Sequence, residues 1–253
     1  MNMTVLTEKI YRKLYKKVFG RIYGIIIKNL PMKVVGFFEA YFKPEFRNAC
    51  EPLNGQQRRK ELFHELMDKI QFNAIVETGT LRGNSTKYLA QQFKVPVYTV
   101  ENFSRYYYCA YFRLSRIRNI CCFQGDSREF LRKLGNNNAF PKKYVLFYLD
   151  AHWYRDLPLR EELRIINEFW SESVIIIDDF KVPDDRGYNF DDYGEGEVLC
   201  LEYIKSNDKF DFEVFWPSAR SSSETGCRCG SVVLATKDSI IKRIREINSL
   251  RQI

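Results

Sequence analysis

Several features that this 253-residue sequence lacks limit what the protein can be. It has only two histidines, and none of its seven cysteines forms a paired C-x-x-C spacing, so we do not expect a zinc-stabilised scaffold. A zinc site at Cys227 and Cys229 would lack two ligands. The odd cysteine count fits a reducing, cytoplasmic setting in which most thiols are buried.

Long apolar runs and two familiar motifs are also missing. The longest uncharged apolar run near the N-terminus, Ile22 to Ile27, is far too short to span a bilayer. No signal peptide is recognisable, because charges run through the place where its apolar core would lie. Without a G-x-G-x-x-G pattern a nucleotide-sugar enzyme is disfavoured, and without an N-P-P-Y pattern so is methylation of nucleic-acid bases.

Positive charge is concentrated at the N-terminus. Residues 1–33 carry a net charge of +7 out of +8 for the whole chain, so the rest is nearly neutral and a nucleic-acid partner is not expected. Apolar side chains recur at helical spacing through residues 5–30. Two interpretations stay open: this helix caps the domain with its apolar stripe, as residues 34–42 would, or it lies on an anionic membrane surface.

Residues 71–253 read as an α/β domain that follows an N-terminal basic amphipathic helical segment, residues 1–70. Apolar segments expected to be strands alternate with helical patterns, which predicts a parallel sheet covered on both faces. The expected strands of this part are 74–76, 97–100, 119–123, 144–149 and 174–177. Two later strands, 210–216 and 230–236, have no helix between them and should be antiparallel. The predicted fold is a doubly wound, Rossmann-like, seven-stranded, mostly parallel sheet with an antiparallel C-terminal hairpin, preceded by N-terminal helices.

Acidic residues lie at or just after the end of each expected parallel strand. They are Glu77, Glu101, Asp126, Asp150 and the pair Asp178-Asp179. The carboxyl edge of an open α/β sheet is where ligands bind, so these acids predict a functional site there. Capping of the next helix explains one such acid, Asp126, but not the whole set.

The segment from residue 73 to 237 resembles the class I S-adenosylmethionine-dependent methyltransferases. The resemblance rests on an acid followed by a glycine turn after the first strand, an acid ending the second strand, and Gly125-Asp126-Ser127 after the third. It implies that the turn holds the methionine end of the cofactor, that Glu101 binds the ribose hydroxyls, and that Asp126 contacts adenine. Leu81 replaces the second glycine of the commonest E/D-x-G-x-G form. The expected cofactor-binding residues are Glu77, Thr78, Gly79, Gly83, Ser85, Glu101, Asp126 and Ser127.

Three carboxylates should converge where the fourth and fifth strands end, at Asp150, Asp178 and Asp179. Carboxylates this close repel one another, and a hard divalent cation would neutralise them. The arrangement resembles the metal-dependent O-methyltransferases of the catechol and sugar types, which implies that all three residues bind Mg²⁺ and that the metal binds the substrate oxygens. Helix capping and loop solvation are the simpler alternative.

A base must remove the proton of a hydroxyl acceptor, and His152 is the candidate, acting beside Asp150. A third protein ligand to the metal is its alternative role. Catechol-type enzymes have a lysine near this point, and this chain has none between Asp150 and Phe180, which favours the sugar type. The loop 180–197 is expected to form a lid or an acceptor wall, although a solvated acidic loop is equally compatible. Its candidate substrate contacts are Tyr188, Asp191, Asp192 and Tyr193.

The sequence therefore predicts an S-adenosylmethionine-dependent, Mg²⁺-assisted O-methyltransferase that acts on a hydroxyl of a sugar or a similar small metabolite. The alternative is a non-catalytic module of the same fold that docks to a membrane or a partner through its basic N-terminal helix. Peripheral membrane contact through residues 1–33 and homo-oligomer formation are both left open.

Overall fold

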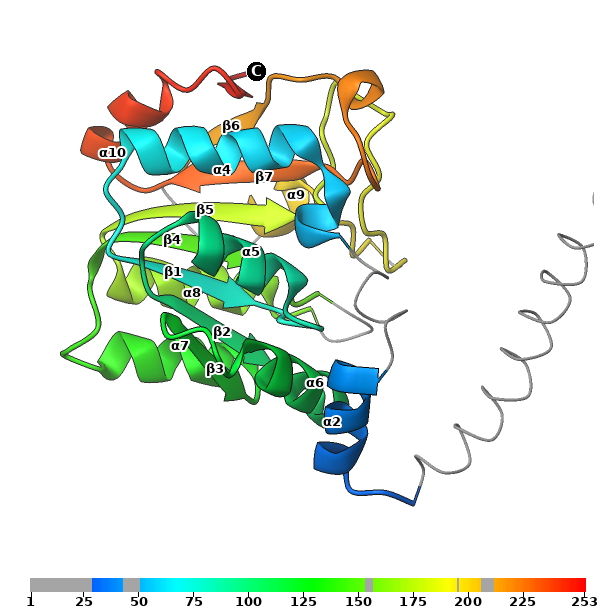
Figure 1. Ribbon diagram of the computed structural model, residues 1–253. Helices are drawn as coiled ribbons and strands as arrows, with labels where there is room; N and C mark the ends of the chain where they lie inside the picture. Colours follow the sequence, from blue (N-terminus) through cyan, green and yellow to red (C-terminus); the bar gives the residue numbers. More distant parts are fainter. Residues whose placement is uncertain (1–28, 43–50, 153–156, 195, 206–211) are drawn as a thin grey trace, which may run out of the picture.

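The computed structural model describes residues 29–42, 51–152, 157–194, 196–205 and 212–253 (Figure 1). Most of the predicted N-terminal basic helix lies outside these ranges. Within them, the strands form one eight-stranded sheet in the order β3-β2-β1-β4-β5-β7-β6-β8. The strands are β1 (Ala74–Thr78), β2 (Val97–Glu101), β3 (Ile120–Gln124), β4 (Lys143–Leu149), β5 (Glu172–Asp178), β6 (Glu213–Pro217), β7 (Ser231–Ala235) and β8 (Leu250–Arg251).

The strand pairing confirms the predicted fold class. Strands β1 to β5 pair in parallel, whereas β7 lies antiparallel between β5 and β6. One detail of the prediction is wrong, because β8 adds an eighth strand to the expected seven. This strand has only two residues, too few to produce a periodic pattern in the sequence.

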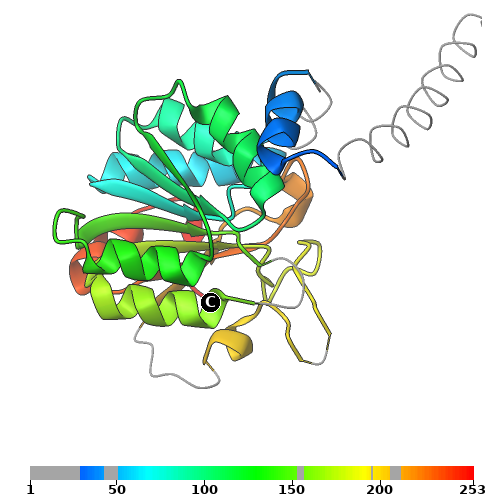
Figure 2. The same ribbon diagram turned by 90° about the horizontal axis from the view of Figure 1, so that it is seen from below.

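Helices cover both faces of the sheet (Figures 1 and 2). One face packs against α4, α5 and α10, and the other against α7, α8 and α9. Helix α6 lies over β2 and β3. The helices are α2 (Met32–Phe42), α4 (Gln57–Lys69), α5 (Asn84–Gln92), α6 (Ser104–Leu114), α7 (Ser127–Asn136), α8 (Leu159–Phe169), α9 (Leu201–Lys205) and α10 (Asp238–Ile244), with short 3₁₀ turns η1 (Pro52–Gly55) and η2 (Ser221–Ser223). Helix α4, assigned from sequence to the N-terminal segment, shares the core of the sheet.

The apolar character of the central strands follows from this double cover. Val145 and Phe147 of β4 belong to the core beneath α7 and α8, whereas Leu146 and Tyr148 belong to the core beneath α4 and α5. Because successive side chains of a strand point to opposite faces, a strand covered on both sides must be apolar throughout. The runs read from the sequence as central strands are indeed central.

Helix α2 differs from its expectation. Residues 34–42 were expected to cap the domain with an apolar stripe. Instead α2 packs on α6 through Val35, Gly36, Glu39 and Ala40, and its aromatic side chains face outward. No helix in the described ranges is long and apolar enough to cross a membrane.

Candidate active site at the carboxyl edge of the sheet

A cavity of about 440 Å³ lies at the carboxyl ends of the central strands. Five of the predicted cofactor-binding residues line it, and so do two of the three predicted metal ligands. Those predicted residues are Gly79, Ser85, Glu101, Asp126, Ser127, Asp150 and Asp179. Other segments complete the wall, chiefly through Glu51, Asn54, Leu81, Arg82, Phe103, Tyr106 and Arg128.

The turn after β1 is held against the end of β4. Asp150 donates its backbone N–H to the carbonyl of Thr78, at 3.0 Å. Gly79 has φ +88°, and a Cβ at this position would overlap the carbonyl oxygen of Asp150. Only glycine satisfies both the backbone conformation and the close approach. The turn therefore brings bare backbone to the cavity, as the sequence indicated.

Glu101 ends β2 at the cavity wall, and its carboxylate fixes the neighbouring loops. Its oxygens accept hydrogen bonds from the backbone N–H groups of Leu81 and Phe103, each at 2.8 Å. Leu81 is the residue that replaces the expected second glycine, and its φ of 49° shows that the glycine-like conformation is kept. Burial raises the pKa of Glu101.

Asp126 caps helix α7, which accounts for part of its role. It accepts a hydrogen bond from the backbone N–H of Arg128 at 2.8 Å, and its carboxylate also pairs with the Arg128 guanidinium. That side-chain hydrogen bond from Arg128 is the main reason why the pKa of Asp126 lies below its usual value. Asp126 and Ser127 still line the cavity, so capping and ligand contact are compatible here.

Three predicted cofactor-binding residues, Glu77, Thr78 and Gly83, are not among those that line the cavity. The Glu77 carboxylate points into the interior, where it accepts hydrogen bonds from the hydroxyls of Thr86 and Thr99. It thereby ties β1, β2 and α5 together. Burial raises the pKa of Glu77 to about 7. Gly83 is the N-cap of α5, and a Cβ there would lie 2.8 Å from the side chain of Leu114, so its role is packing.

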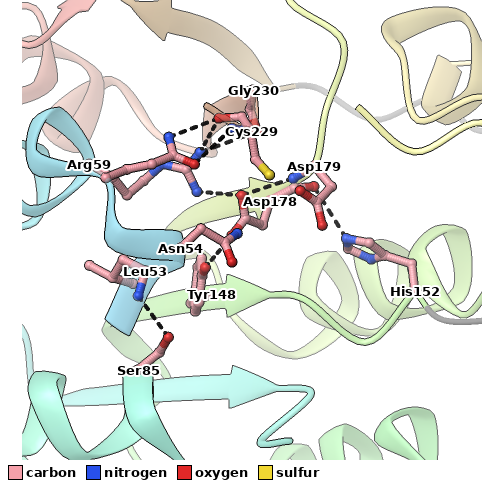
Figure 3. Close-up of polar contacts among 11 residues, drawn as sticks. Leu53, Asn54, Arg59, Ser85, Tyr148, His152, Asp178, Asp179, Cys229 and Gly230 are labelled. Atoms are coloured by element: carbon pink, nitrogen blue, oxygen red, sulfur yellow. Dashed lines mark hydrogen bonds and ion pairs between the residues drawn. The ribbon is translucent and has the colours of Figure 1, made fainter. Parts of the chain in front are cut away.

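Asp178 is the centre of a buried polar cluster (Figure 3). Its Oδ1 accepts from Arg59 Nη1 at 2.5 Å and from the Asp179 N–H at 2.9 Å. Its Oδ2 accepts from Asn54 Nδ2 at 3.1 Å and from the hydroxyl of Tyr148. Burial disfavours the charged form of Asp178, but the Arg59 charge and these hydrogen bonds hold its pKa below the usual value.

This cluster corrects the predicted metal site. Both Asp178 oxygens are engaged by protein donors, so this residue balances the charge of Arg59 instead of a metal. No group of three or more His, Cys, Asp or Glu side chains in a metal-binding arrangement occurs in the described residues. Asp150 and Asp179 do reach the cavity together. The residues present do not fit the three-carboxylate Mg²⁺ site that the sequence suggested.

The two remaining carboxylates share a buried environment. Burial, together with the negative charges of Asp178 and Asp179, raises the pKa of Asp150 well above its usual value. Burial and the Asp178 charge raise the pKa of Asp179 to about 7. Asp179 has φ +50°, an uncommon conformation for a residue other than glycine. Such conformations concentrate at functional sites.

His152 lies behind the cavity wall and does not line it. Its side chain is buried, and Nε2 lies 3.2 Å from the backbone carbonyl of Asp178 (Figure 3). Its Nδ1 has no hydrogen-bond partner among the described residues. Burial lowers the pKa of His152, which disfavours the charged ring. The placement suits support of the β5 end and does not suit contact with an acceptor in the cavity.

The predicted substrate contacts in the loop after β5 also lie away from the lining of this cavity. Tyr188 is buried in the core and donates to the carbonyl of Ala219 at 3.0 Å. The Tyr193 hydroxyl lies 2.6 Å from the Asp191 carboxylate and also contacts the His152 carbonyl. Asp192 accepts from the N–H of Gly194 at 2.9 Å. These polar groups hold the loop together.

Sequence reasoning missed several other residues of the cavity wall. Asn54 comes from η1, and Phe103 and Tyr106 come from the start of α6. The aromatic-rich pattern directly after Glu101 was a usable signal for the last two. Nothing near Asn54 in the sequence indicates that η1 folds over the end of β5, because its partner Asp178 lies 124 residues away.

Comparison with known proteins gives the fold a name. No protein-family model matches the chain, and no curated protein sequence matches it. The structure is similar to that of the O-methyltransferase TomG from Streptomyces achromogenes, which is involved in tomaymycin synthesis and was solved with S-adenosylmethionine. The two chains are 13% identical, and the TM-score is 0.51 over 89% of this chain and 98% of TomG. An O-methyltransferase from Bacillus cereus, solved with S-adenosylhomocysteine, gives 15% identity and a TM-score of 0.50 over 88% and 99%. The chain therefore has the Rossmann-like α/β fold of the S-adenosylmethionine-dependent methyltransferases.

Proposed function

We propose that this protein transfers the methyl group of S-adenosylmethionine to a hydroxyl oxygen of a small acceptor such as a sugar. The observation that carries the proposal is the composition of one cavity. The glycine turn, Glu101 and Asp126 lie on its walls together with the carboxylates of Asp150 and Asp179. The first three suit the cofactor, and the last two suit an acceptor that must lose a proton. The likeness to structures that contain S-adenosylmethionine or S-adenosylhomocysteine supports the cofactor.

The cofactor side of the cavity combines bare backbone with the carboxylates of Glu101 and Asp126. The turn at Gly79 admits a ligand close to the main chain. Glu101 uses its oxygens for two backbone N–H groups, and its remaining lone pairs can accept from ribose hydroxyls. Phe103 is exposed at this wall and offers a flat face to an adenine ring. When bound, S-adenosylmethionine supplies an electrophilic methyl group on a sulfonium.

The acceptor side supplies a base. A hydroxyl is a weak nucleophile until its proton leaves, and Asp150 and Asp179 are two carboxylates that line the cavity just after β4 and just after β5. We assign the proton to one of these carboxylates while the acceptor oxygen bonds to the methyl carbon and the carbon–sulfur bond breaks. The products are the methyl ether and S-adenosylhomocysteine. In this scheme His152 positions β5 and does not take the proton.

A separate question is whether a divalent cation assists the methyl transfer. The three-carboxylate site expected from the sequence would need the Asp178 carboxylate as well, and four donors of the protein already occupy that carboxylate. We therefore propose that Asp150 and Asp179 act without Mg²⁺. Calorimetry with and without the metal, described in the Discussion, tests this part separately from the methyl transfer.

Calorimetric titration with S-adenosylhomocysteine tests the cofactor site directly. We expect binding in the micromolar range, on the order of 8 kcal/mol, and loss of most of it in Glu101→Gln. Glu129→Gln, an exposed acid on α7, is the matched control and should bind normally. Thermal melting of each variant shows whether it is folded. Absence of binding in the folded wild-type protein would overturn the proposed function.

A further inference from the structure

Helix α2 presents an unusual distribution of side chains. It buries Val35, Gly36, Glu39 and Ala40, including its only acidic residue. It exposes Val34, Phe37, Phe38, Tyr41 and Phe42. The exposed fractions reach 47% at Phe38 and 65% at Phe42. A surface helix normally turns its apolar stripe inward, so α2 has the reverse of the expected orientation.

Specific contacts with α6 fix this orientation. A Cβ added at Gly36 would lie 2.5 Å from the Cβ of Tyr108, so the two helices touch at their small residues. The Glu39 carboxylate accepts from Arg105 Nε at 3.0 Å and from Nη2 at 2.5 Å, and Glu39 is only 2% exposed. Rotating α2 to bury its aromatic rings would break this ion pair and lose the close helix contact. The outward aromatic surface is therefore built into the packing.

The surface continues onto α6. The Phe112 ring lies 5.3 Å from that of Phe37 and 5.5 Å from that of Tyr111, measured between centroids. Tyr111 is itself exposed. We call the group formed by Phe37, Phe38, Tyr41, Phe42 and Tyr111 the aromatic face. Contiguous exposed apolar surface of this kind marks a site of interaction.

The charges around the aromatic face identify its partner. Residues 29–42 and 103–119 contain one acidic residue, the buried Glu39. Lys33, Arg116 and Arg118 are exposed there, and residues 1–33, which lead directly into α2, carry a net charge of +7. Aromatic rings beside lysine and arginine suit a bilayer surface with anionic head groups. A second copy of the chain would instead bring two cationic surfaces together.

We propose that the aromatic face docks the protein on a bilayer that contains anionic lipid, with the basic residues 1–33 adding electrostatic attraction. Figure 1 shows α2 beside the end of the sheet to which the arrowheads of β1 and β5 point. Docking through α2 would therefore bring this edge of the sheet, where the cavity lies, close to the lipid. The proposal does not depend on methyl transfer and can be tested without an acceptor.

Vesicle sedimentation of the full chain tests the proposal. We expect binding to vesicles of phosphatidylcholine with phosphatidylglycerol, and much weaker binding to phosphatidylcholine alone. The double variant Phe38→Ser/Phe42→Ser should bind the anionic vesicles at least about tenfold more weakly, because two rings no longer enter the interface. Phe190→Ser is the matched control, since Phe190 is 36% exposed but lies in the loop after β5. It should bind like the wild type.

Two results would overturn the proposal. The wild-type chain could fail to sediment with anionic vesicles, or the double variant could bind them as well as the wild type, in which case the basic segment alone suffices. Light scattering of each protein without lipid adds an independent measurement. Dimerisation of the wild type that the double variant loses, with no vesicle binding, would assign the aromatic face to a second copy. Melting curves verify that the double variant is folded.

Discussion

At the scale of single residues, the buried glutamates Glu77 and Glu162 differ in the hydrogen bonds that the protein gives their carboxylates. Glu77 accepts hydrogen bonds from two threonine hydroxyls. Glu162 of α8 is fully buried, and neither of its carboxylate oxygens has a hydrogen-bond partner of normal geometry among the described residues. Burial raises the pKa of each to about 7, although the hydroxyls of nearby Ser127 and Thr78 partly offset this at Glu162. A carboxyl buried in this way is protonated in the folded protein over a wider pH range than in the unfolded chain.

Glu162 therefore makes folding stability depend on pH. Its pKa is about 7 when folded and 4.5 in its ordinary state, so the folded protein holds this proton more tightly. The resulting stability is fully present below about pH 4.5 and is lost as the pH rises through about 7. Glu162→Gln, which carries no charge, should remove this loss. Relative to the wild type, it should gain on the order of 3 kcal/mol of unfolding free energy between about pH 5 and about pH 8.

Urea unfolding at the two pH values measures this difference. Glu168→Gln, at an exposed position of the same helix, is the control and should follow the wild type at both. If Glu162→Gln and the wild type lose stability in parallel between the two pH values, Glu162 does not carry the proton assigned to it.

A comparison of Gly79 with Gly194 separates two costs of replacing a glycine by alanine, namely backbone strain and steric overlap of the new Cβ. An alanine there meets both the unfavourable φ of +88° and the carbonyl of Asp150. Gly194 has a similar φ of +79°, but a Cβ there would meet nothing within 4 Å. We expect Gly194→Ala to cost about 1 kcal/mol and Gly79→Ala about 3 kcal/mol or more. Equal losses of unfolding free energy in urea would show that the contact with Asp150 contributes little.

At the scale of secondary-structure elements, helix α4 is connected to the end of β5 through one buried ion pair. Arg59 donates to Asp178 and to the carbonyls of Cys229 and Gly230. Both charged side chains are almost completely buried. Removing one partner of such a pair leaves the other charge without compensation, which costs more than replacing both.

The ion pair predicts a characteristic pattern of mutant stabilities. Arg59→Met should destabilise the protein by about 3 to 5 kcal/mol, whereas Arg58→Met, at an exposed neighbouring position, should change little. The double variant Arg59→Met/Asp178→Asn should recover part of the loss, because no unpaired charge remains. Urea unfolding of Arg59→Met, Asp178→Asn and the double variant, each compared with the wild type, gives the coupling energy. A double variant that loses the sum of both single changes would contradict the pairing.

How far the sequence predicts the elements depends on the length of their patterns. The apolar runs of β4 and β5 define these strands to within a few residues, because burial on both faces demands continuous apolar character. The strand β8 is missed, because its two residues are too few to show a periodic pattern. The orientation of α2 was also unpredictable, since its aromatic pattern is typical of a buried helix.

At the scale of the whole molecule, the candidate site is predictable in position but only partly in detail. The rule that ligands bind at the carboxyl edge correctly places Glu101, Asp126 and Asp150 at one cavity. It cannot show which way a carboxylate at a strand end points. Asp178 turns inward because Arg59, 119 residues earlier, lies beneath it, and no local pattern encodes that contact. At this point the three-carboxylate arrangement expected from the sequence differs from the structure.

The charge balance of the site leads to the last prediction. Arg59 compensates Asp178, and burial together with mutual repulsion raises the pKa of both Asp150 and Asp179, so the cluster need not hold three negative charges near neutral pH. A cation is then not required to make the three residues compatible. We expect no stoichiometric Mn²⁺ or Mg²⁺ binding by calorimetry, and an unchanged affinity for S-adenosylhomocysteine after dialysis against a chelator. Stoichiometric Mn²⁺ binding that disappears in both Asp150→Asn and Asp179→Asn would show instead that these two carboxylates hold a metal without Asp178. That result would contradict the proposal that Asp150 and Asp179 act without a metal. It would not contradict methyl transfer, because the titration with S-adenosylhomocysteine tests the cofactor site separately.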